Sequence, residues 1–287
     1  MSVSLYAGSD VSRATLKVAN AEIPVLGFGT YSMSGPKLQT VLVEALRHGF
    51  RHIDTAQMYQ NEKDVGAAIR AAGVPRSEIF ITTKVWVSNY GRQDFIRSVD
   101  QSLESLGTDY IDLLLVHWPR GGAPIAEQVE GLNKAVDLGK ARYIGVSNYS
   151  SDMLHAAAAL SKHPLVTNQV EYHPFLDQRA LLAQVEQEET SLMAYCGMAV
   201  GRVFQAPLLK DIAARHNRSV AQVVLRWLIQ QPRVVALSRT ESIDRIPANT
   251  KIFDFALSEK DMAAIGTLRT PGSRIVNPGH LAPSWDS

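Results

Sequence analysis

The sequence has a single cysteine, Cys196, among its 287 residues. One cysteine excludes an intrachain disulfide framework and a cysteine-rich zinc site, and it fits a reducing compartment. No apolar run reaches the length of about eighteen residues that predicts a membrane span. The first residues also lack the basic and apolar regions of a signal peptide. We therefore expect a soluble, cytoplasmic globular protein.

Neither sign of charge is in excess, because the sequence has 29 basic and 28 acidic residues and no long block of one sign. A nucleic-acid or membrane-surface partner would leave an electrostatic footprint that this sequence does not carry. Linkers rich in proline, glycine or serine, low-complexity segments and internal repeats are also missing. The absence of a linker favours one compact domain.

Short apolar runs alternate with amphipathic ones along the chain, which is typical of strands that alternate with helices. The stretch "LKVANAEIPVLGFGTY" predicts a hairpin that leads into a first inner strand at Leu26–Gly29. This strand begins a series of eight strand–helix units, and "SEKDMAAIGTL" predicts one further helix. Eight such units in this length predict an α/β fold, a (β/α)₈ TIM barrel with an N-terminal β-hairpin and an extra C-terminal helix.

We expect residues 1–287 to form this single barrel domain. Residues 1–15 are predicted to be a flexible N-terminus, and residues 271–287 a C-terminal tail over the barrel mouth. No exposed apolar stripe is evident, so we expect a monomer.

Polar residues stand where the predicted strands end, which is the end of such a barrel that carries chemistry. In chain order they are Asp54, Lys84, His117, Ser147 with Asn148, Asn168 with Gln169, Tyr195, and Ser238 with Arg239, while Tyr59 lies just beyond the second strand. Each has an ordinary structural explanation: an Asp ends turns, a His can be a satisfied core residue, and a Lys can pair with any carboxylate. Three ionisable groups at the ends of successive apolar strands favour function instead.

The chemistry that fits this set is reduction of a carbonyl group. A free tyrosine has a pKa of about 10, which is high for proton transfer near neutrality. A cation about 4 Å away, at an effective dielectric constant near 20, favours the phenolate by roughly 4 kcal/mol, or about 3 pKa units. We expect Lys84 to supply this field, and Asp54 to hold Lys84 and keep it charged while cancelling part of its effect. We expect His117 to orient the substrate oxygen and Tyr59 to donate the proton.

These residues lie in segments that resemble the aldo-keto reductase family. The segments are "GFGTY", "HIDTAQMYQNE", "FITTKVW", "LLLVHWP", "GVSNY" and "NQVEYHP", in the family's order and across nearly the whole chain. The resemblance implies a TIM barrel closed at its bottom by an N-terminal hairpin. It also implies a nicotinamide cofactor that binds in an extended form, without a Rossmann domain.

The resemblance assigns roles residue by residue. Tyr59 is the implied general acid, with Asp54, Lys84 and His117 completing a tetrad that also meets the cofactor and substrate. Further implied cofactor contacts are Ser147, Asn148 and Gln169 at the carboxamide, Tyr195 on the nicotinamide ring, and Gly29, Thr30 and Tyr31 at the ribose. Gly197 and Met198 lie in a turn expected to approach the pyrophosphate. Trp86 and Trp118 are expected to line the substrate pocket, although they also fit ordinary buried aromatics.

The segment expected to hold the adenosine end, "ALSRTESIDRIPAN", departs from the family pattern. Arg239 and Thr240 replace the usual Lys-Ser, Arg245 and Asn249 are kept, and Ala248 replaces a Glu. Two guanidinium groups, a hydroxyl and a helix N-terminus predict a phosphate site, hence NADPH. Glu241 and the missing Glu leave use of NADH open.

The turn "YCGMAVGRVF" and the ending "RIVNPGHLAPSWDS" are similar to 2,5-diketogluconate reductase B and methylglyoxal reductase members of the family. Related bacterial members also reduce bulkier ketones, such as 3-keto trichothecenes, and the sequence does not choose among these substrates. A nucleotide-binding regulatory protein of the same fold stays an alternative. A short-chain dehydrogenase is disfavoured because "GFGT" is too short for the glycine-rich turn after the first strand of a Rossmann unit. Asp54, His117 and His173 lack metal-ligand spacing.

Overall fold

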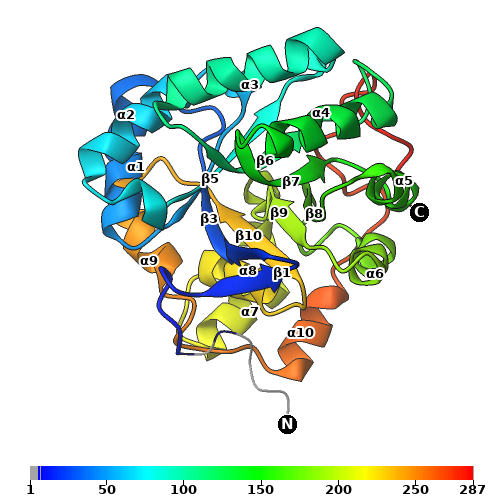
Figure 1. The fold of residues 1–287 in the computed structure, drawn as a ribbon. Helices are drawn as coiled ribbons and strands as arrows, with labels where there is room; N and C mark the ends of the chain where they lie inside the picture. Colours follow the sequence, from blue (N-terminus) through cyan, green and yellow to red (C-terminus); the bar gives the residue numbers. More distant parts are fainter. Residues whose placement is uncertain (1–5, 7, 287) are drawn as a thin grey trace.

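The computed structural model describes residue 6 and residues 8–286, and its strands form a closed ring surrounded by helices (Figure 1). The ring is a barrel of eight parallel strands in the order β10-β3-β4-β5-β6-β7-β8-β9. The barrel strands are β3 (Leu26–Gly29), β4 (His52–Asp54), β5 (Phe80–Val85), β6 (Ile111–Val116), β7 (Ala141–Ser147), β8 (Leu165–Glu171), β9 (Leu192–Tyr195) and β10 (Val234–Ser238). The predicted (β/α)₈ barrel is confirmed.

The helices cover the outer face of the barrel (Figure 1). They are α1 (Gly35–Arg47), α2 (Glu62–Ala72), α3 (Arg92–Leu106), α4 (Ile125–Asp137), α5 (Ser151–Leu160), α6 (Arg179–Gln187), α7 (Pro207–Arg215), α8 (Val220–Ile229), α9 (Ile246–Thr250) and α10 (Glu259–Gly266). A break around Asn217 separates α7 from α8, and the predicted extra C-terminal helix is α10. Among the described residues, no helix is long and apolar enough to cross a membrane.

Local sequence explains several helix boundaries. Helix α8 begins with a capping box, in which Ser219 and Gln222 satisfy each other's free backbone N–H groups. Helices α2 and α3 end at glycines with positive φ, at Gly73 and Gly107. The two helices also approach each other closely, because a Cβ atom on Gly66 would lie 2.2 Å from the Leu106 carbonyl oxygen. Only glycine permits this packing.

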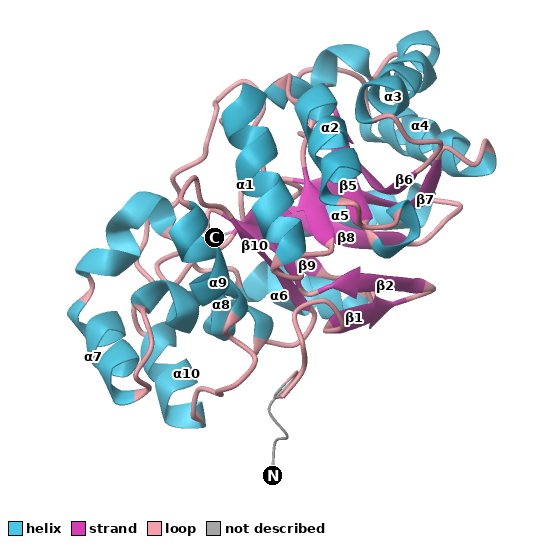
Figure 2. Ribbon diagram, turned by 90° about the vertical axis from the view of Figure 1, so that its left-hand side faces the viewer, coloured by secondary structure: helices cyan, strands magenta, loops and turns pink. Residues whose placement is uncertain are grey.

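The antiparallel hairpin of β1 (Thr15–Val18) and β2 (Ala21–Pro24) lies across one end of the barrel (Figure 2). Val18, Ala21 and Ile23 are buried against side chains of the barrel interior, among them Leu113 and Val235. The hairpin therefore seals the N-terminal ends of the strands with apolar contacts. Any functional cavity must open at the opposite end, where the strands finish.

The first and last segments that the structure describes both contact the helical layer around the barrel. The Gly8 N–H donates a hydrogen bond to the Phe253 carbonyl oxygen at 2.7 Å, and Val11 is buried. Of the segment predicted to be flexible, residues 1–5 and 7 lie outside the described residues. At the other end, Asp286 accepts hydrogen bonds from the Ser151 N–H at 3.1 and 3.2 Å. Residue 287 lies outside the described part of the chain.

Candidate active site

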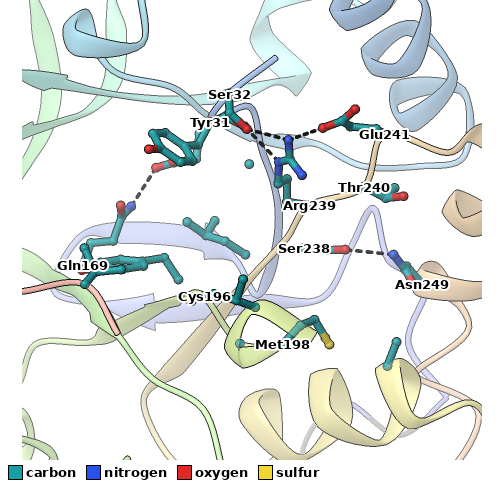
Figure 3. Close-up of a pocket in the computed structure, with 18 of the residues that line it drawn as sticks. Tyr31, Ser32, Gln169, Cys196, Met198, Ser238, Arg239, Thr240, Glu241 and Asn249 are labelled. Carbon is teal, nitrogen blue, oxygen red and sulfur yellow. Dashed lines mark hydrogen bonds and ion pairs between the residues drawn. The ribbon is translucent and has the colours of Figure 1, made fainter. Parts of the chain in front are cut away.

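A cavity of about 1180 Å³ opens at the C-terminal ends of the strands. Its lining brings together side chains from strands and loops far apart in the sequence (Figure 3). Of the residues predicted to carry function, the lining includes Gly29, Tyr31, Asp54, Tyr59, His117, Trp118, Ser147, Asn148, Gln169, Tyr195, Gly197, Met198, Arg239, Thr240, Arg245 and Asn249. Lys84, Thr30 and Trp86 lie behind this surface.

The Lys84 side chain is the centre of a buried cluster beneath the cavity. Its Nζ donates hydrogen bonds to Asp54 Oδ1 and the Thr55 carbonyl oxygen, each at 2.8 Å, and to Tyr59 Oη at 3.3 Å. The side chains of Lys84 and Asp54 are 1% and 4% exposed. An ammonium group has three N–H donors, so all of them are used. The predicted Asp–Lys–Tyr arrangement is present, with Tyr59 facing the cavity.

The acidity of Tyr59 differs from the sequence-based expectation. Burial, then the Asp54 charge and the neighbouring Tyr31, raise the pKa of Tyr59 well above its usual value. Burial also lowers the pKa of Lys84, while its contacts with Asp54 act in the opposite direction. The expected net lowering of the Tyr59 pKa is therefore wrong for this arrangement, because burial and the Asp54 charge raise it. Tyr59 is therefore held protonated.

His117 follows β6 directly, and its ring lies against those of Tyr59 and Trp86, at centroid distances of 5.7 and 5.2 Å. Burial, and then the Lys84 charge, lower the pKa of His117 well below its usual value. The imidazole is therefore neutral near neutral pH. Its buried Nδ1 has no hydrogen-bond partner among the described residues. A neutral imidazole in this position can orient an oxygen atom, but it is a poor acid.

Four polar side chains at the ends of β7, β8 and β9 form one hydrogen-bond network. Tyr195 Oη donates to Asn148 Oδ1 at 2.7 Å, and Asn148 Nδ2 donates to Ser147 Oγ at 3.1 Å. Ser147 Oγ donates to the Gln169 carbonyl oxygen at 2.8 Å, and Gln169 Nε2 donates to Asp54 Oδ2 at 2.7 Å. The network connects the predicted carboxamide site to the carboxylate that holds Lys84.

A register shift in the sheet sets the position of this network. Pairing of β7 with β8 is irregular between Ile144 and Val146, and it then places Ser147 opposite Gln169. A Cβ atom on Gly145 would lie 2.6 Å from the Thr167 carbonyl oxygen, so glycine permits the close approach. The extra residue lies in β8, where the three steps from Leu165 to Asn168 oppose the two from Ile144 to Val146 in β7. Ser147 and Asn148, at the end of β7, both line the cavity.

The loop after β10 supplies the charges expected at the adenosine end. Arg239 donates hydrogen bonds from Nε to the Tyr31 carbonyl oxygen at 2.9 Å and from a terminal nitrogen to Ser32 Oγ at 2.7 Å (Figure 3). Its guanidinium also pairs with Glu241 at 2.5 Å, and Glu241 pairs in addition with Lys37. Arg239 thus connects the loop after the last barrel strand to the residues that follow the first one. The Glu241 carboxylate partly neutralises its positive charge.

Only some of the other residues in this loop are placed so that they could contact the phosphate group predicted here. Arg245 lines the cavity, and Asn249 donates to Ser238 Oγ at 3.1 Å. The Thr240 hydroxyl accepts from the Ser242 N–H at 3.1 Å, so it supports the loop. Helix α9 has only five residues. The expected helix N-terminus therefore gives little support for a phosphate, and the guanidinium groups are the main candidates.

Two of the predicted contacts are placed differently from the expectation. Thr30 is fully buried and outside the cavity lining, and its hydroxyl donates to the Asp54 carbonyl oxygen at 3.0 Å. It supports the strand end and does not face the cavity. Trp86 is likewise outside the lining, and it reaches the site through the His117 ring. Cys196 does line the cavity, where burial, and then the Glu171 charge, raise the pKa of its thiol to about 11.

Gln57 was missed by sequence reasoning. Its Oε1 accepts hydrogen bonds from the Trp86 N–H and Asn89 Nδ2, both at 2.9 Å. Its Nε2 donates to the Ser98 carbonyl oxygen at 3.1 Å and to Ser102 Oγ at 3.2 Å. Gln57 therefore ties the short helix η1 (Gln57–Tyr59), which carries the predicted acid, to the loop of Trp86. Its place two residues before Tyr59 was the only available signal.

Glu171 was also missed, and it anchors the C-terminal segment. Its two carboxylate oxygens accept hydrogen bonds from the Ile275 and Val276 N–H groups, each at 2.8 Å, and one also contacts His173 Nε2 at 2.9 Å. Burial acts to raise the pKa of Glu171, but these hydrogen bonds together outweigh it, so the pKa lies below its usual value. Val276 lines the cavity. The last part of the chain thus contributes to the barrel mouth.

The aldo/keto reductase family model matches residues 25–269, so the chain belongs to this family of oxidoreductases. The methylglyoxal reductase DkgB of Yersinia pestis is 38% identical over 92% of this chain and 99% of its own. The glyoxal reductase of Bacillus subtilis is 38% identical over 93% of this chain and 97% of its own.

Solved structures agree with this assignment. A putative 2,5-diketo-D-gluconic acid reductase B superposes with a TM-score of 0.94 at 50% identity, covering 95% of this chain and 97% of that one. The Bombyx mori aldo-keto reductase in complex with NADP superposes with a TM-score of 0.84 at 32% identity, covering 89% of this chain and 92% of that one.

Proposed function

We propose that this protein reduces an aldehyde or ketone to the alcohol with NADPH, and that Tyr59 donates the proton. The observation that carries the proposal is the position of Tyr59. Its hydroxyl faces a cavity of about 1180 Å³ and lies 3.3 Å from a buried ammonium group held by a carboxylate. A phenol kept protonated beside a fixed cation can release a proton into a developing alkoxide and leave a stabilised phenolate.

The cavity suits an extended dinucleotide. Amide and hydroxyl groups lie at the ends of β7 and β8, and the guanidinium groups of Arg239 and Arg245 lie at the loop after β10. The Bombyx mori relative was solved in complex with NADP, which supports the same cofactor here. When bound, reduced nicotinamide would supply the hydride. The guanidinium groups favour the extra phosphate of NADPH, so we expect NADPH to be preferred. Because Glu241 partly neutralises the charge of Arg239, we expect NADH to be used as well.

The proposed roles of the protein side chains follow from their charge states. Neutral His117 orients the carbonyl oxygen toward Tyr59. Tyr59 gives its proton to that oxygen, and the Lys84 ammonium group stabilises the phenolate that results. Asp54 keeps Lys84 in position through one carboxylate oxygen, while Gln169 holds the other. All of these groups come from one chain, so we propose that a monomer is active.

The proposed substrates are small carbonyl compounds. The names of the relatives point to methylglyoxal, glyoxal and 2,5-diketogluconate, and a bulkier ketone such as a 3-keto trichothecene is the remaining candidate. We propose neither a nucleic acid nor a membrane as a partner, because acidic and basic residues nearly balance.

Replacing Tyr59 by phenylalanine tests the assignment of the proton donor. We expect Tyr59→Phe to fold and bind NADPH, and to lose about 10²–10⁴ in turnover, because a positioned acid contributes this much. Loss of reduced-nicotinamide absorbance measures turnover, and fluorescence titration measures binding. Tyr143→Phe is the matched control, since its hydroxyl contacts the Asn20 carbonyl oxygen on the hairpin, far from the cavity. An active Tyr59→Phe variant would show that another group is the acid.

The alternative is a nucleotide-binding regulatory protein with little turnover. The fold alone does not separate the two functions, since they share the barrel. A panel of methylglyoxal, a diketogluconate, aromatic aldehydes and bulky cyclic ketones separates them. A protein that binds NADPH tightly and reduces none of these compounds would favour the regulatory function.

A further inference from the structure

A buried carboxylate outside the cavity lies close to the Lys84 cluster. Glu62 is the first residue of α2, and only 8% of it is exposed. Its Oε1 accepts a hydrogen bond from Thr83 Oγ1 at 2.6 Å, and its Oε2 accepts one from Ser102 Oγ at 3.2 Å. Two hydroxyl donors and the start of a helix favour the ionised carboxylate over the neutral acid. Glu62 is therefore placed as an anion inside the protein.

Glu62 acts on Lys84 from the side opposite to Asp54. Thr83 and Lys84 are successive residues of β5, so their side chains point to opposite faces of the strand. Lys84 points into the barrel, where it meets Asp54, whereas Thr83 points outward to Glu62. The Glu62 charge acts to raise the pKa of Lys84, and the Lys84 charge acts to lower the pKa of Glu62. The two charges thus stabilise each other across the strand.

The two carboxylates differ in their effect on Tyr59. Asp54 acts to raise the pKa of Lys84, but it also raises the pKa of Tyr59 and so opposes formation of the phenolate. Glu62 acts on Lys84 and is not among the groups that raise the pKa of Tyr59. A negative charge outside the strand therefore favours the protonated lysine without disfavouring the phenolate that the lysine stabilises.

Glu62 is also connected to the short helix that carries the proposed acid. Ser102 Oγ, which donates to Glu62, accepts a hydrogen bond from Gln57 Nε2 at 3.2 Å. Gln57 is the first residue of η1, and Tyr59 is the last. The other carboxylate oxygen of Glu62 is bound by Thr83 of β5. Through its two oxygens, Glu62 therefore links the strand of the lysine to the helix of the tyrosine.

The charge of Glu62 does not help the protein to fold. Burial raises its pKa, and the Thr83 and Ser102 hydrogen bonds and the Lys84 charge offset only part of this effect. A raised carboxyl pKa means that the folded state disfavours the ionised form, so the charge lowers stability once the pH exceeds that pKa. An amide of the same size would keep hydrogen bonds to both hydroxyls without this penalty. The charge therefore indicates a role in the site.

We propose that Glu62 is a positioning residue for the proton transfer, which keeps the Lys84 ammonium group charged and in place beside Tyr59 from outside β5. This inference rests on the proposed reductase function and adds a residue to the same site. The charged and titratable groups around Lys84 come from four elements, and they are Asp54 and His52 in β4, Tyr59 in η1, Glu62 in α2 and His117 after β6. Burial lowers the pKa of both histidines, so they are neutral near neutral pH and the carboxylates are the anions that act on Lys84.

Removing the charge at constant size tests the proposal. Glu62→Gln can still accept from Thr83 and can donate to Ser102. The measured quantity is the rate of NADPH oxidation in a single turnover with para-nitrobenzaldehyde from about pH 6 to 10, because a single turnover separates the chemical step from product release. Without the Glu62 charge Lys84 should lose its proton at lower pH, so the alkaline decline in rate should begin earlier. The ratio of the rates at pH 7 and pH 9.5 should rise about threefold over the wild type.

Three further variants separate charge from structure. Glu62→Met is a second uncharged variant and should show the same displacement. Glu62→Asp keeps a carboxylate, so its alkaline decline should match that of the wild type even where the rate falls. Asp112→Asn removes a buried carboxylate that pairs with Arg76 at 2.6 Å near the start of β6, at the far end of the barrel, and should lower the urea midpoint without moving the decline.

A wild-type alkaline decline in the uncharged variants, or an equal displacement in Glu62→Asp, would overturn the inference and leave the reductase function intact. A lower urea midpoint in Glu62→Gln together with an unmoved decline would show that its role is structural only. Failure of the wild-type protein to oxidise NADPH with any aldehyde that is offered, although it binds the cofactor, would instead remove the reductase function and the inference with it.

Discussion

His52 gives a prediction about how stability depends on pH. The imidazole is fully buried in β4, with Nε2 2.9 Å from Thr82 Oγ1 and Nδ1 3.3 Å from the Pro24 carbonyl oxygen. Burial, partly opposed by the Asp54 charge, lowers the pKa of His52 from 6.5 to about 4. The folded protein thus holds this histidine neutral, and protonation acts against folding.

The direction in which stability changes with pH depends on how many protons the folded and unfolded states bind. Between about pH 6.5 and 4 the unfolded chain binds a proton at His52 that the folded chain excludes, so stability falls as pH falls. A shift from 6.5 to about 4 corresponds to about 3 kcal/mol in total, at 1.36 kcal/mol per pKa unit. Between pH 7 and 4.5, roughly 2 kcal/mol of this should be lost.

Urea denaturation of the wild-type protein and of His52→Asn at several pH values measures this contribution. The variant is expected to be less stable near neutrality, because it loses packing. Its free energy of unfolding should nevertheless decline less steeply toward pH 4.5, by roughly 2 kcal/mol over the interval. His155→Gln, which removes a histidine exposed on α5, should keep the wild-type decline. Parallel pH profiles for wild type and His52→Asn would refute the reasoning.

Two further predictions concern the site. Gln57→Leu removes the hydrogen-bond partners of the Trp86 N–H and Ser102 Oγ, so the free energy of unfolding in urea should fall by about 1–3 kcal/mol. We also expect a lower kcat with unchanged NADPH affinity. A loss of stability with a normal kcat would show that the role of Gln57 is purely structural. Glu241→Gln removes the carboxylate that pairs with the Arg239 guanidinium, so NADPH should bind up to about fivefold more tightly while the affinity for NADH stays the same. Added salt should reduce this difference. Equal changes in affinity for both cofactors would contradict a phosphate contact at Arg239.

The barrel could be predicted because its signals are local. Alternation of apolar and amphipathic runs defines the strands, and β3 and β4 end at the residues expected, Gly29 and Asp54. Once the strand ends were known, the barrel itself placed Asp54, Lys84 and His117 near one another. Parallel strands that share an edge need no further information to bring their final residues together.

What could not be predicted depends on contacts between distant segments. Gln57 meets Ser102 across 45 residues, and Glu171 meets Val276 across 105. Neither pairing has a sequence pattern. The pKa direction of Tyr59 was also wrong, since the expectation counted the Lys84 charge and could not count burial. Burial is a property of the whole packed barrel, so it is available only from the structure.

The closure between β3 and β10 has a consequence for how the molecule is made. Leu26 pairs with Ala236 and Phe28 with Ser238, so the first and last barrel strands meet only after some two hundred residues of chain have intervened. Closing such a long loop costs entropy before any pairing compensates for it. The Arg239 contacts to Tyr31 and Ser32 lie on this seam. During synthesis, therefore, the cavity does not exist until β10 has left the ribosome, and a ligand bound across the seam holds the earliest and latest barrel strands together.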